Sequence, residues 1–355
     1  MHIRENQLLA PFTTFGIGGP ARWFVEATTE DEIAEAVEWA RQKDAQLFVL
    51  GGGSNLLVSD HGFDGLVVHI GLRGVTSARN ADDPAHRLYQ CAAGENWDEF
   101  VERAAQENCA GIECMAGIPG TVGGTPVQNV GAYGQEVAST IACVRAFDRQ
   151  ERAFVEFSAA ECNFAYRRSR FNSADYGRFI VTRVNYELTI DGAPTLRYAD
   201  LQRVFERSAS APSLTEVTAA VRRIRQSKAM LIVPGDPDSR SAGSFFKNPV
   251  VSEDLAQQIA AGGSKELPLF PAGPGPGNAG KVKLPAAWLI EHAGFKKGFA
   301  RGAAAISSRH TLALVNRGEA TAMDILDLAS EISSAVEKRF GIQLEMEPVF
   351  VGRLA

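Results

Sequence analysis

The chain has 355 residues, of which 45% are hydrophobic and 22% are charged, and its formal net charge is −6 at pH 7. This composition is ordinary for a globular protein, and the length predicts two or three domains. A negative net charge argues against a general nucleic-acid-binding protein, so we expect no nucleic-acid partner. The sequence has no apolar run near the roughly 20 residues of a membrane span and no signal-peptide layout at its start, so we expect a cytoplasmic protein away from the membrane.

Cysteine and histidine spacing predicts neither a disulfide framework nor a metal site. The five cysteines are scattered without a CxxC pair, and the six histidines form no HxH or HExxH pattern. We therefore expect no metal and reduced, mostly buried thiols. The cysteines are Cys91, Cys109, Cys114, Cys143 and Cys162.

The first half of the chain predicts mixed α/β structure. Thr29 and Glu32 have the spacing of a capping box, and apolar residues at helical spacing follow them. A buried-type strand at 46–50 runs into the glycine-rich segment 51–55, and the residues after it favour more strand. A second short helix is expected around Trp97, and the chain up to Ile190 favours β structure with apolar residues in alternation. The apolar residues of the first helix are Ile33, Ala36, Val37 and Ala40; those of the alternating strand are Val184, Tyr186, Leu188 and Ile190.

The second half predicts a connecting helix, a loop and a long helix. Ser213 and Glu216 form a second capping-box pattern before a helix. The Pro/Gly-rich segment 267–280 predicts an exposed, mobile loop. A clear amphipathic helix begins after Thr321 and ends near Gly341, and the tail 342–352 alternates like a strand.

Two glycine-rich loops predict a phosphate site. "LGGGSNLLV" (50–58) lacks the GK[ST] of a Walker loop, and a strand-like segment follows it where a dinucleotide fingerprint would open a helix. "GIPGTVGG" (117–124) is the second loop. Tight turns alone would explain either loop, but two such loops beside strands together favour a phosphate held by loop amides.

The order of motifs resembles that of the UDP-N-acetylenolpyruvoylglucosamine reductase family. The resemblance rests on "TTFGIGGPARWFVEATTEDEI", "LGGGSNLLVSDHGFDGLVV" and "GIPGTVGGTPVQNVGAYGQE", and continues through "YRRSRF", "AGSFFKNP", residues 286–298 and "LEMEPVFVG". It spans nearly the whole chain. It implies an α+β fold: a vanillyl-alcohol-oxidase-like FAD-binding unit of two subdomains and a C-terminal substrate-binding domain.

The resemblance also implies a reaction. In this family NADPH reduces non-covalently bound FAD, which passes a hydride to the enolpyruvyl group of UDP-N-acetylenolpyruvoylglucosamine, giving UDP-N-acetylmuramate for peptidoglycan synthesis. The flavin carries the hydride chemistry, so the protein must orient the reactants, stabilise charge and supply one proton. We expect a monomer whose partners are these small molecules.

Three residues match the family's catalytic motifs. Arg167 would hold the substrate carboxylate, Ser244 would deliver a proton to carbon, and Glu347, protonated through a raised pKa, would donate a hydrogen bond to the enolate. Lys247 or a relayed water would have to assist Ser244. Without the resemblance these residues read as a surface cation, a turn serine and an exposed strand carboxylate.

The binding residues are also implied by the resemblance. His61, near the first loop, is expected to be structural, and "TLRYADLQ" resembles the type I branch, in which the tyrosine lies on a loop closing over the nucleotide. The link between Lys228 and "AGSFF" is longer than is usual in the family. For FAD the residues are Gly51, Gly52, Gly53, Ser54, Asn55, Pro119, Gly120 and Gly123; for the substrate they are Tyr133, Tyr198, Lys228, Asn248 and His310.

The sequence also predicts domain limits and leaves three alternative functions open. Residues 1–72 and 73–212 are expected as the two FAD-binding subdomains, 213–228 as a connector helix, 229–341 as the substrate domain and 342–355 as a strand returning to the active site. The alternatives are an oxidase of the same FAD fold, a flavin-binding module without turnover, and a sugar-nucleotide transferase without flavin.

Overall fold

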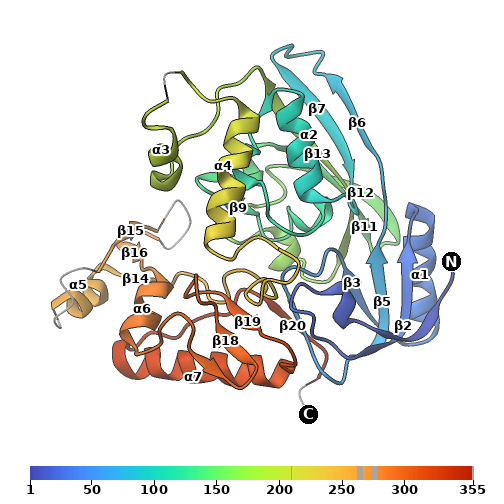
Figure 1. Cartoon of the computed structure of the whole chain (residues 1–355). Coiled ribbons are helices and arrows are strands. Elements are labelled where there is room, and N and C mark those ends of the chain that lie inside the picture. The colour runs from blue at the N-terminus through green and yellow to red at the C-terminus, as the bar shows by residue number, and fades with distance from the viewer. Residues whose placement is uncertain (209, 262–266, 273–277, 354–355) are drawn as a thin grey trace. The chain divides into compact units, whose positions relative to one another are not determined.

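The structure is a computed structural model that describes residues 1–355 except 209, 262–266, 273–277 and 354–355 (Figure 1). The chain forms two compact units, here called the N-terminal and C-terminal units. The N-terminal unit comprises Met1–Gln7, Ala21–Gly53 and Asp64–Ser227; the C-terminal unit comprises Leu8–Pro20, Ser54–Phe63 and Lys228–Ala355. The five-part division expected from the sequence remains a prediction.

A four-stranded sheet and one helix make up the first part of the N-terminal unit. Its strand order is β1-β2-β5-β3, with β3 and β5 parallel. The helix α1 (Glu30–Gln42) begins as predicted, because the Thr29 hydroxyl accepts the Glu32 N–H at 3.2 Å. The Glu32 carboxylate turns to the N–H of Thr28 rather than that of Thr29, at 2.8 Å. The strands are β1 (Arg4–Leu8), β2 (Pro20–Ala27), β3 (Gln46–Leu50) and β5 (Phe63–Ile70).

An antiparallel sheet follows, with the order β12-β11-β13-β7-β6. The predicted alternation in β13 is confirmed, because Val184, Tyr186 and Leu188 are fully buried on one face. The two-residue strand β8 adds to the end of β13. The strands are β6 (Val75–Arg79), β7 (His86–Ala92), β8 (Cys109–Ala110), β11 (Ile141–Asp148), β12 (Ala153–Ser158) and β13 (Phe179–Ile190).

Helix α2 (Trp97–Gln106) lies against the antiparallel sheet, and helix α4 (Leu214–Ser227) packs beside α2 (Figure 1). Phe100 of α2 packs on the rings of Tyr89 and Tyr186, and Trp97 packs on Tyr186, with ring centroids 5.2 to 5.8 Å apart. The sequence predicted both helices, and the Ser213–Glu216 capping pattern before α4 is confirmed by hydrogen bonds in both directions. Aromatic burial of this kind dominates the stability of a core.

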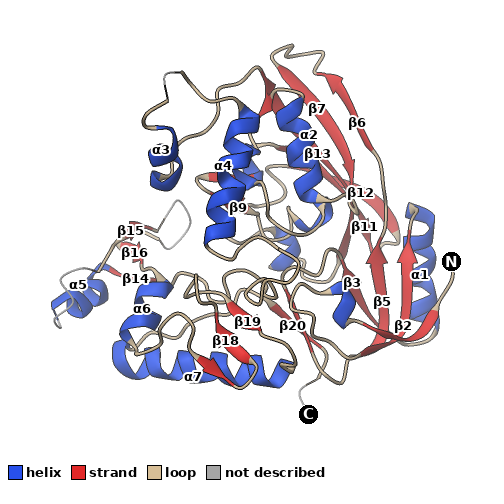
Figure 2. Cartoon of the chain, in the orientation of Figure 1, coloured by secondary structure: helices blue, strands red, loops and turns tan. Residues whose placement is uncertain are grey.

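The C-terminal unit has its own hydrophobic core. Figure 2 shows its short strands beside three helices, α5 (Glu253–Ala261), α6 (Ala286–His292) and α7 (Ala322–Phe340). The strand orders are β14-β16-β15 and β17-β18-β19, and β20 pairs with β4 in parallel. The strands are β4 (Leu56–Val58), β14 (Val250–Ser252), β15 (Phe270–Pro271), β16 (Lys281–Lys283), β17 (Ala300–Arg301), β18 (Ala304–Ile306), β19 (Leu314–Asn316) and β20 (Val349–Val351).

The long helix α7 has the ends that the sequence predicts. Thr321 and Asp324 form a full capping box, and Gly341 ends the helix in the left-handed conformation at φ 66°. The apolar stripe of the helix is buried in the core of the C-terminal unit. Its members are Ala322, Ile325, Leu328, Ala329, Ile332 and Val336.

The predicted strand at 342–352 is too long. Only Val349–Val351 form a strand, because only they have a partner strand, β4, to complete the backbone hydrogen bonds. Ile342 and Leu344 are still buried, which explains the alternation in the sequence. In the Pro/Gly-rich segment, residues 273–277 lie outside the described residues, and Phe270 just before them is 49% exposed in β15.

Five free thiols are present, as predicted, and four of them are buried while that of Cys143 is partly exposed. Burial raises the pKa of the Cys162 thiol to about 12, so this thiol stays protonated near neutral pH. Among the described residues, none of the helices combines the length and the apolar character needed to cross a membrane.

Candidate active site

The two glycine loops meet within the N-terminal unit. A Cβ built on Gly52 would lie 2.5 Å from the Cα of Gly120, and one on Gly51 would lie 3.0 Å from the Thr121 hydroxyl. Backbone therefore packs directly on backbone at this point, which only glycine permits. Strand β4 follows the first loop, as the sequence predicted, so this loop does not open a helix.

The second loop is held by backbone hydrogen bonds. The Trp97 N–H donates to the Gly120 carbonyl at 3.2 Å, and the Gly123 N–H donates to the Ala93 carbonyl at 2.8 Å. A Cβ on Gly123 would lie 2.6 Å from that of Ala93. These contacts create a rigid, small-residue surface that suits the diphosphate of FAD, which backbone N–H groups can approach closely. Gly51–Gly53 and Pro119–Gly123 are the residues of this unit that would hold it.

Tyr133 and Tyr198 come together in the N-terminal unit. Tyr133 lies in the turn between β9 (Gly131–Ala132) and β10 (Gln135–Glu136), with φ 49° followed by φ 86° at Gly134, as a type I′ turn requires. Tyr198 precedes helix α3 (Ala199–Phe205) and is 48% exposed. The two rings meet edge to face at 5.3 Å.

Arg167 lies beside the same hairpin. Its Nη1 donates to the Gly131 carbonyl at 3.3 Å, and its backbone has φ 54°. The Asn172 amide donates to the Arg167 carbonyl at 3.1 Å, which holds this uncommon conformation in place. The half-buried guanidinium is therefore positioned next to the segment that carries Tyr133.

Arg225 is a residue near the site that sequence reasoning missed. It lies on α4, is 6% exposed, and donates from Nε to the Gly117 carbonyl at 3.1 Å. Burial lowers the pKa of its guanidinium, and the nearby charge of Arg167 acts in the same direction. The only sequence signal was its place three residues before Lys228 in "RQSK", a run of polar residues that resembles any solvated helix end.

A buried carboxylate links the segments that carry the two tyrosines. Glu113 is 1% exposed and accepts the N–H groups of Gly111 and Thr195, each at 2.8 Å. It also accepts the side-chain amide of Gln135, in strand β10, at 2.9 Å. Thr195 lies three residues before Tyr198, so Glu113 fixes the base of that segment to the Tyr133 hairpin.

We expect Glu113→Gln to destabilise the protein by about 1–3 kcal/mol, because an amide NH2 would face N–H donors that the carboxylate satisfies. We also expect a higher KM for the substrate, since the base of the Tyr198 segment would loosen. Thermal unfolding and steady-state kinetics would measure both effects. The matched control is Glu99→Gln, at an exposed position of α2. Equal unfolding temperatures for the two variants would contradict this prediction.

Ser244 and Glu347 lie on neighbouring segments of the C-terminal unit. The Glu347 N–H donates to the Phe245 carbonyl at 2.8 Å, and the Lys247 N–H donates to the Glu345 carbonyl at 2.9 Å. The two segments therefore run antiparallel, with Phe246 bridged to Met346. Ser244 itself is half-buried.

Phe245 and Phe246 anchor the serine segment. They are 1% and 2% exposed, and their rings pack on each other with centroids 5.3 Å apart. The Phe245 ring also packs edge to face on that of Phe15, with ring centroids 6.4 Å apart, and the Phe245 N–H donates to the Leu312 carbonyl at 2.7 Å. Both rings thus belong to the core of the C-terminal unit and anchor the backbone that follows Ser244.

The polar residues after Ser244 have partners of their own. The Lys247 ammonium pairs with the Glu345 carboxylate. The Asn248 side-chain oxygen accepts the N–H of Ala286, at the start of α6, at 2.9 Å. This contact fixes the orientation of the Asn248 amide, whose nitrogen is the donor that a phosphate oxygen would require.

Asn55 holds the tail that carries Glu347. Its side-chain amide donates to the Glu347 carbonyl at 3.3 Å, and its own carbonyl accepts the Val349 N–H at 2.9 Å. Strand β20 then continues beside β4. Asn55 therefore fixes the backbone on both sides of Pro348 within the C-terminal unit.

A buried aspartate supports the segment that carries His310. Asp238 is 2% exposed, and its carboxylate accepts the Ser307 hydroxyl at 3.0 Å and the Ser308 hydroxyl at 2.6 Å. It also pairs with Arg317 at 3.3 Å. The long link after Lys228 therefore serves to place Asp238 under the turn before β19.

Two further predicted residues lie at the ends of elements. Lys228 follows the last residue of α4 directly and is half-buried. His61 is exposed in a turn where its N–H donates to the Ser59 hydroxyl at 3.1 Å. The C-terminal unit thus contains Lys228, Ser244, Asn248, His310 and Glu347, and the N-terminal unit contains Tyr133, Arg167 and Tyr198.

Two family models match parts of this chain. The family model for the FAD binding domain matches residues 21–151, and the model for the C-terminal domain of UDP-N-acetylenolpyruvoylglucosamine reductase matches residues 236–351. The expected α+β fold, with a flavin-binding unit before a separate C-terminal domain, is therefore confirmed. Together they define an FAD-dependent oxidoreductase.

Similarity over the whole chain identifies the family. A UDP-N-acetylenolpyruvoylglucosamine reductase of Streptomyces coelicolor is 46% identical over 97% of this chain and 89% of its own, and one of Thermobifida fusca is 44% identical over 98% of both. The crystal structure of the reductase from Thermus caldophilus matches 99% of this chain and 100% of its own, with a TM-score of 0.66 and 27% identity. The chain belongs to the UDP-N-acetylenolpyruvoylglucosamine reductase family.

Proposed function

We propose that the protein reduces UDP-N-acetylenolpyruvoylglucosamine to UDP-N-acetylmuramate with NADPH, as a monomer with non-covalently bound FAD. Bound FAD would supply the hydride chemistry, from NADPH to the enolpyruvyl double bond. The net reaction adds one hydride and one proton across that bond and oxidises NADPH to NADP+. The observation that carries the proposal is the antiparallel contact of the Ser244 and Glu347 segments in a member of this reductase family.

The chain's own residues stabilise the charge that follows hydride addition. Arg167 holds the substrate carboxylate, since a guanidinium can donate two parallel hydrogen bonds to it. Glu347, in its protonated form, donates a hydrogen bond to the enolate, whereas its ionised form would repel it. Ser244 then gives its hydroxyl proton to the substrate carbon and regains a proton through Lys247 or a water.

The remaining residues bind the reactants. Tyr133, Tyr198, Lys228, Asn248 and His310 bind the nucleotide sugar, with the Lys228 ammonium and the Asn248 amide on its diphosphate. The exposed ring of Tyr198, placed through Glu113 at its base, is suited to cover a nucleotide. The glycine loops hold FAD through backbone N–H groups.

An anaerobic absorbance trace tests this function. The bound flavin is first bleached with NADPH, and UDP-N-acetylenolpyruvoylglucosamine is then added before oxygen. We expect the oxidised flavin band to return at once. A flavin that stays bleached until air enters would indicate an oxidase or a flavoprotein without turnover, and a colourless protein after incubation with FAD would indicate a transferase that uses no flavin.

Glu347→Gln tests the protonated carboxyl. Because the protonated form is the active one, we expect wild-type kcat to be highest at low pH and to fall as rising pH ionises Glu347. The amide of the variant donates a hydrogen bond at every pH, so this fall should disappear. The control is Glu345→Gln, two residues earlier and paired with Lys247. A wild-type profile that is flat, or unchanged by Glu347→Gln, would contradict the proposal.

A further inference from the structure

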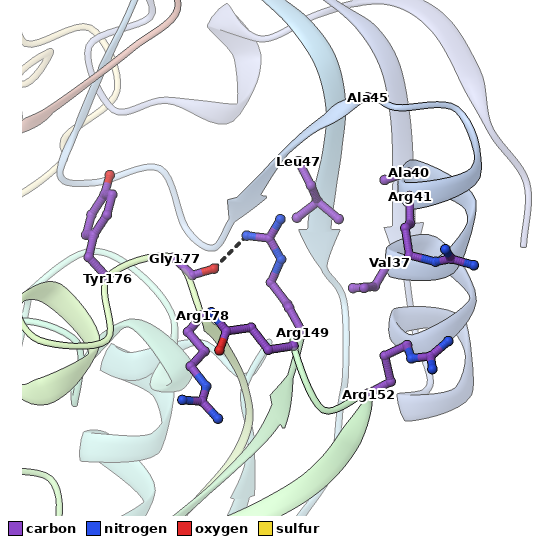
Figure 3. Close-up of a pocket in the computed structure, with 11 residues that line it drawn as sticks. Val37, Ala40, Arg41, Ala45, Leu47, Arg149, Arg152, Tyr176, Gly177 and Arg178 are labelled. Atoms are coloured by element: carbon purple, nitrogen blue, oxygen red, sulfur yellow. Dashed lines mark hydrogen bonds between the residues drawn. The ribbon is translucent and has the colours of Figure 1, made fainter.

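A pocket of about 400 Å³ lies in the N-terminal unit, between helix α1, the start of β3 and the turn that joins β11 to β12 (Figure 3). Val37 and Ala40 of α1 and Leu47 of β3 form its apolar side. The glycine loop begins at Gly51, four residues after Leu47. At about 3.3 Å per residue in a strand, these two positions are about 13 Å apart. The pocket is therefore separate from the flavin loops.

Four arginines line this pocket, and three of them pair with carboxylates. Arg178 binds Asp148 at 2.6 Å. Arg41 binds Glu38 at 2.7 Å, and Arg152 lies 3.8 Å from the same carboxylate. Glu151, on the turn between β11 and β12, and Asp175, which pairs with Arg170, also act on Arg178. Glu38, Asp148 and Glu151 therefore balance the charge of these three arginines, and the remaining positive charge is that of the fourth.

Arg149 is the fourth, and it points into the pocket (Figure 3). Its guanidinium is half-buried and donates from Nη1 to the Gly177 carbonyl at 2.6 Å. Among the described residues, no carboxylate pairs with it. Burial lowers the pKa of this guanidinium because the charged form loses contact with water. A half-buried cation without a counter-charge carries a desolvation cost that an anion beside it would offset.

We propose that this pocket is a second anion site, which binds the phosphate group of a small phosphorylated molecule or inorganic phosphate. The Arg149 guanidinium, which points into the pocket, supplies two coplanar N–H donors. Arg152, on the turn between β11 and β12, supplies a further donor from an exposed position. The apolar side formed by Val37 and Leu47 is suited to the carbon skeleton of a phosphate ester. The site does not depend on the proposed reaction, because it uses none of the residues assigned to it.

Titration of the flavin-loaded protein with inorganic phosphate, followed by calorimetry and by thermal unfolding, tests the site. A buffer without other polyvalent anions is required. We expect saturable binding of one phosphate per chain and an unfolding temperature that rises with phosphate concentration. Glycerol 3-phosphate in place of phosphate tests the ester as the source, and at least equal affinity is expected.

Arg149→Gln should weaken phosphate binding by about tenfold or more, since a charge-assisted pair is lost. The control is Arg79→Gln, an exposed arginine in β6 outside the pocket, which should bind as the wild type does. Arg152→Gln is a second test at an exposed position, in case the Arg149 variant does not fold. Absence of saturable binding, or equal affinity in the wild type and both pocket variants, would overturn the proposal.

Discussion

Ser244→Ala should slow the return of the oxidised flavin band by about 10²–10⁴-fold when the enolpyruvyl substrate is added to the reduced protein. The variant loses the hydroxyl that we propose as the proton donor to carbon, whereas hydride transfer from NADPH to the flavin needs no proton from this residue. Bleaching by NADPH should therefore proceed at the wild-type rate. Stopped-flow absorbance measures the two half-reactions separately.

The structure provides a control for this variant. Ser252, in β14 of the same unit, is exposed, and its hydroxyl accepts the Leu255 N–H at 3.3 Å. Ser252→Ala should leave both half-reactions unchanged. If Ser244→Ala also reoxidised its flavin at the wild-type rate, the serine would be only a turn residue in the segment that Phe245 and Phe246 anchor.

Gly52→Ala should produce a protein with little bound flavin. The new Cβ would lie 2.5 Å from the Cα of Gly120, a backbone atom that no change of side-chain rotamer can move away. The loops would have to separate, at a cost of about 1–3 kcal/mol, and the surface offered to FAD would change with them. We expect the FAD dissociation constant to rise by about 10- to 100-fold, measured by titrating the flavin-free protein.

Gly124→Ala is the matched control for Gly52→Ala. Gly124 lies at the end of the second loop, its backbone does not have the positive φ that favours glycine, and a Cβ there would have no neighbour within 4 Å. The flavin-free form of this variant should unfold at the wild-type temperature. Wild-type flavin affinity in Gly52→Ala would show that the backbone contact between the loops is not required to bind FAD.

The ends of helices could be predicted from the sequence. Thr29, Ser213 and Thr321 each satisfy backbone N–H groups three residues ahead, so the interaction lies within four consecutive residues and the sequence displays both partners. The alternating face of β13 was predicted for the same reason, because the period of two is a property of the strand itself. The motifs around Ser244, Arg167 and Glu347 were equally visible, because each is a short run of neighbouring residues.

Contacts between distant residues could not be predicted in this way. The Gly52–Gly120 approach, the pairing of Phe245 with Glu347, and the hydrogen bonds of Glu113 to Gln135 and Thr195 each join segments between about 20 and 100 residues apart. The tail shows the same limit, since residues 342–348 alternate like a strand but only Val349–Val351 find a partner, in β4. An isolated segment has an intrinsic preference for helix or strand, but its backbone hydrogen bonds and its burial depend on partner segments that only the folded protein brings beside it.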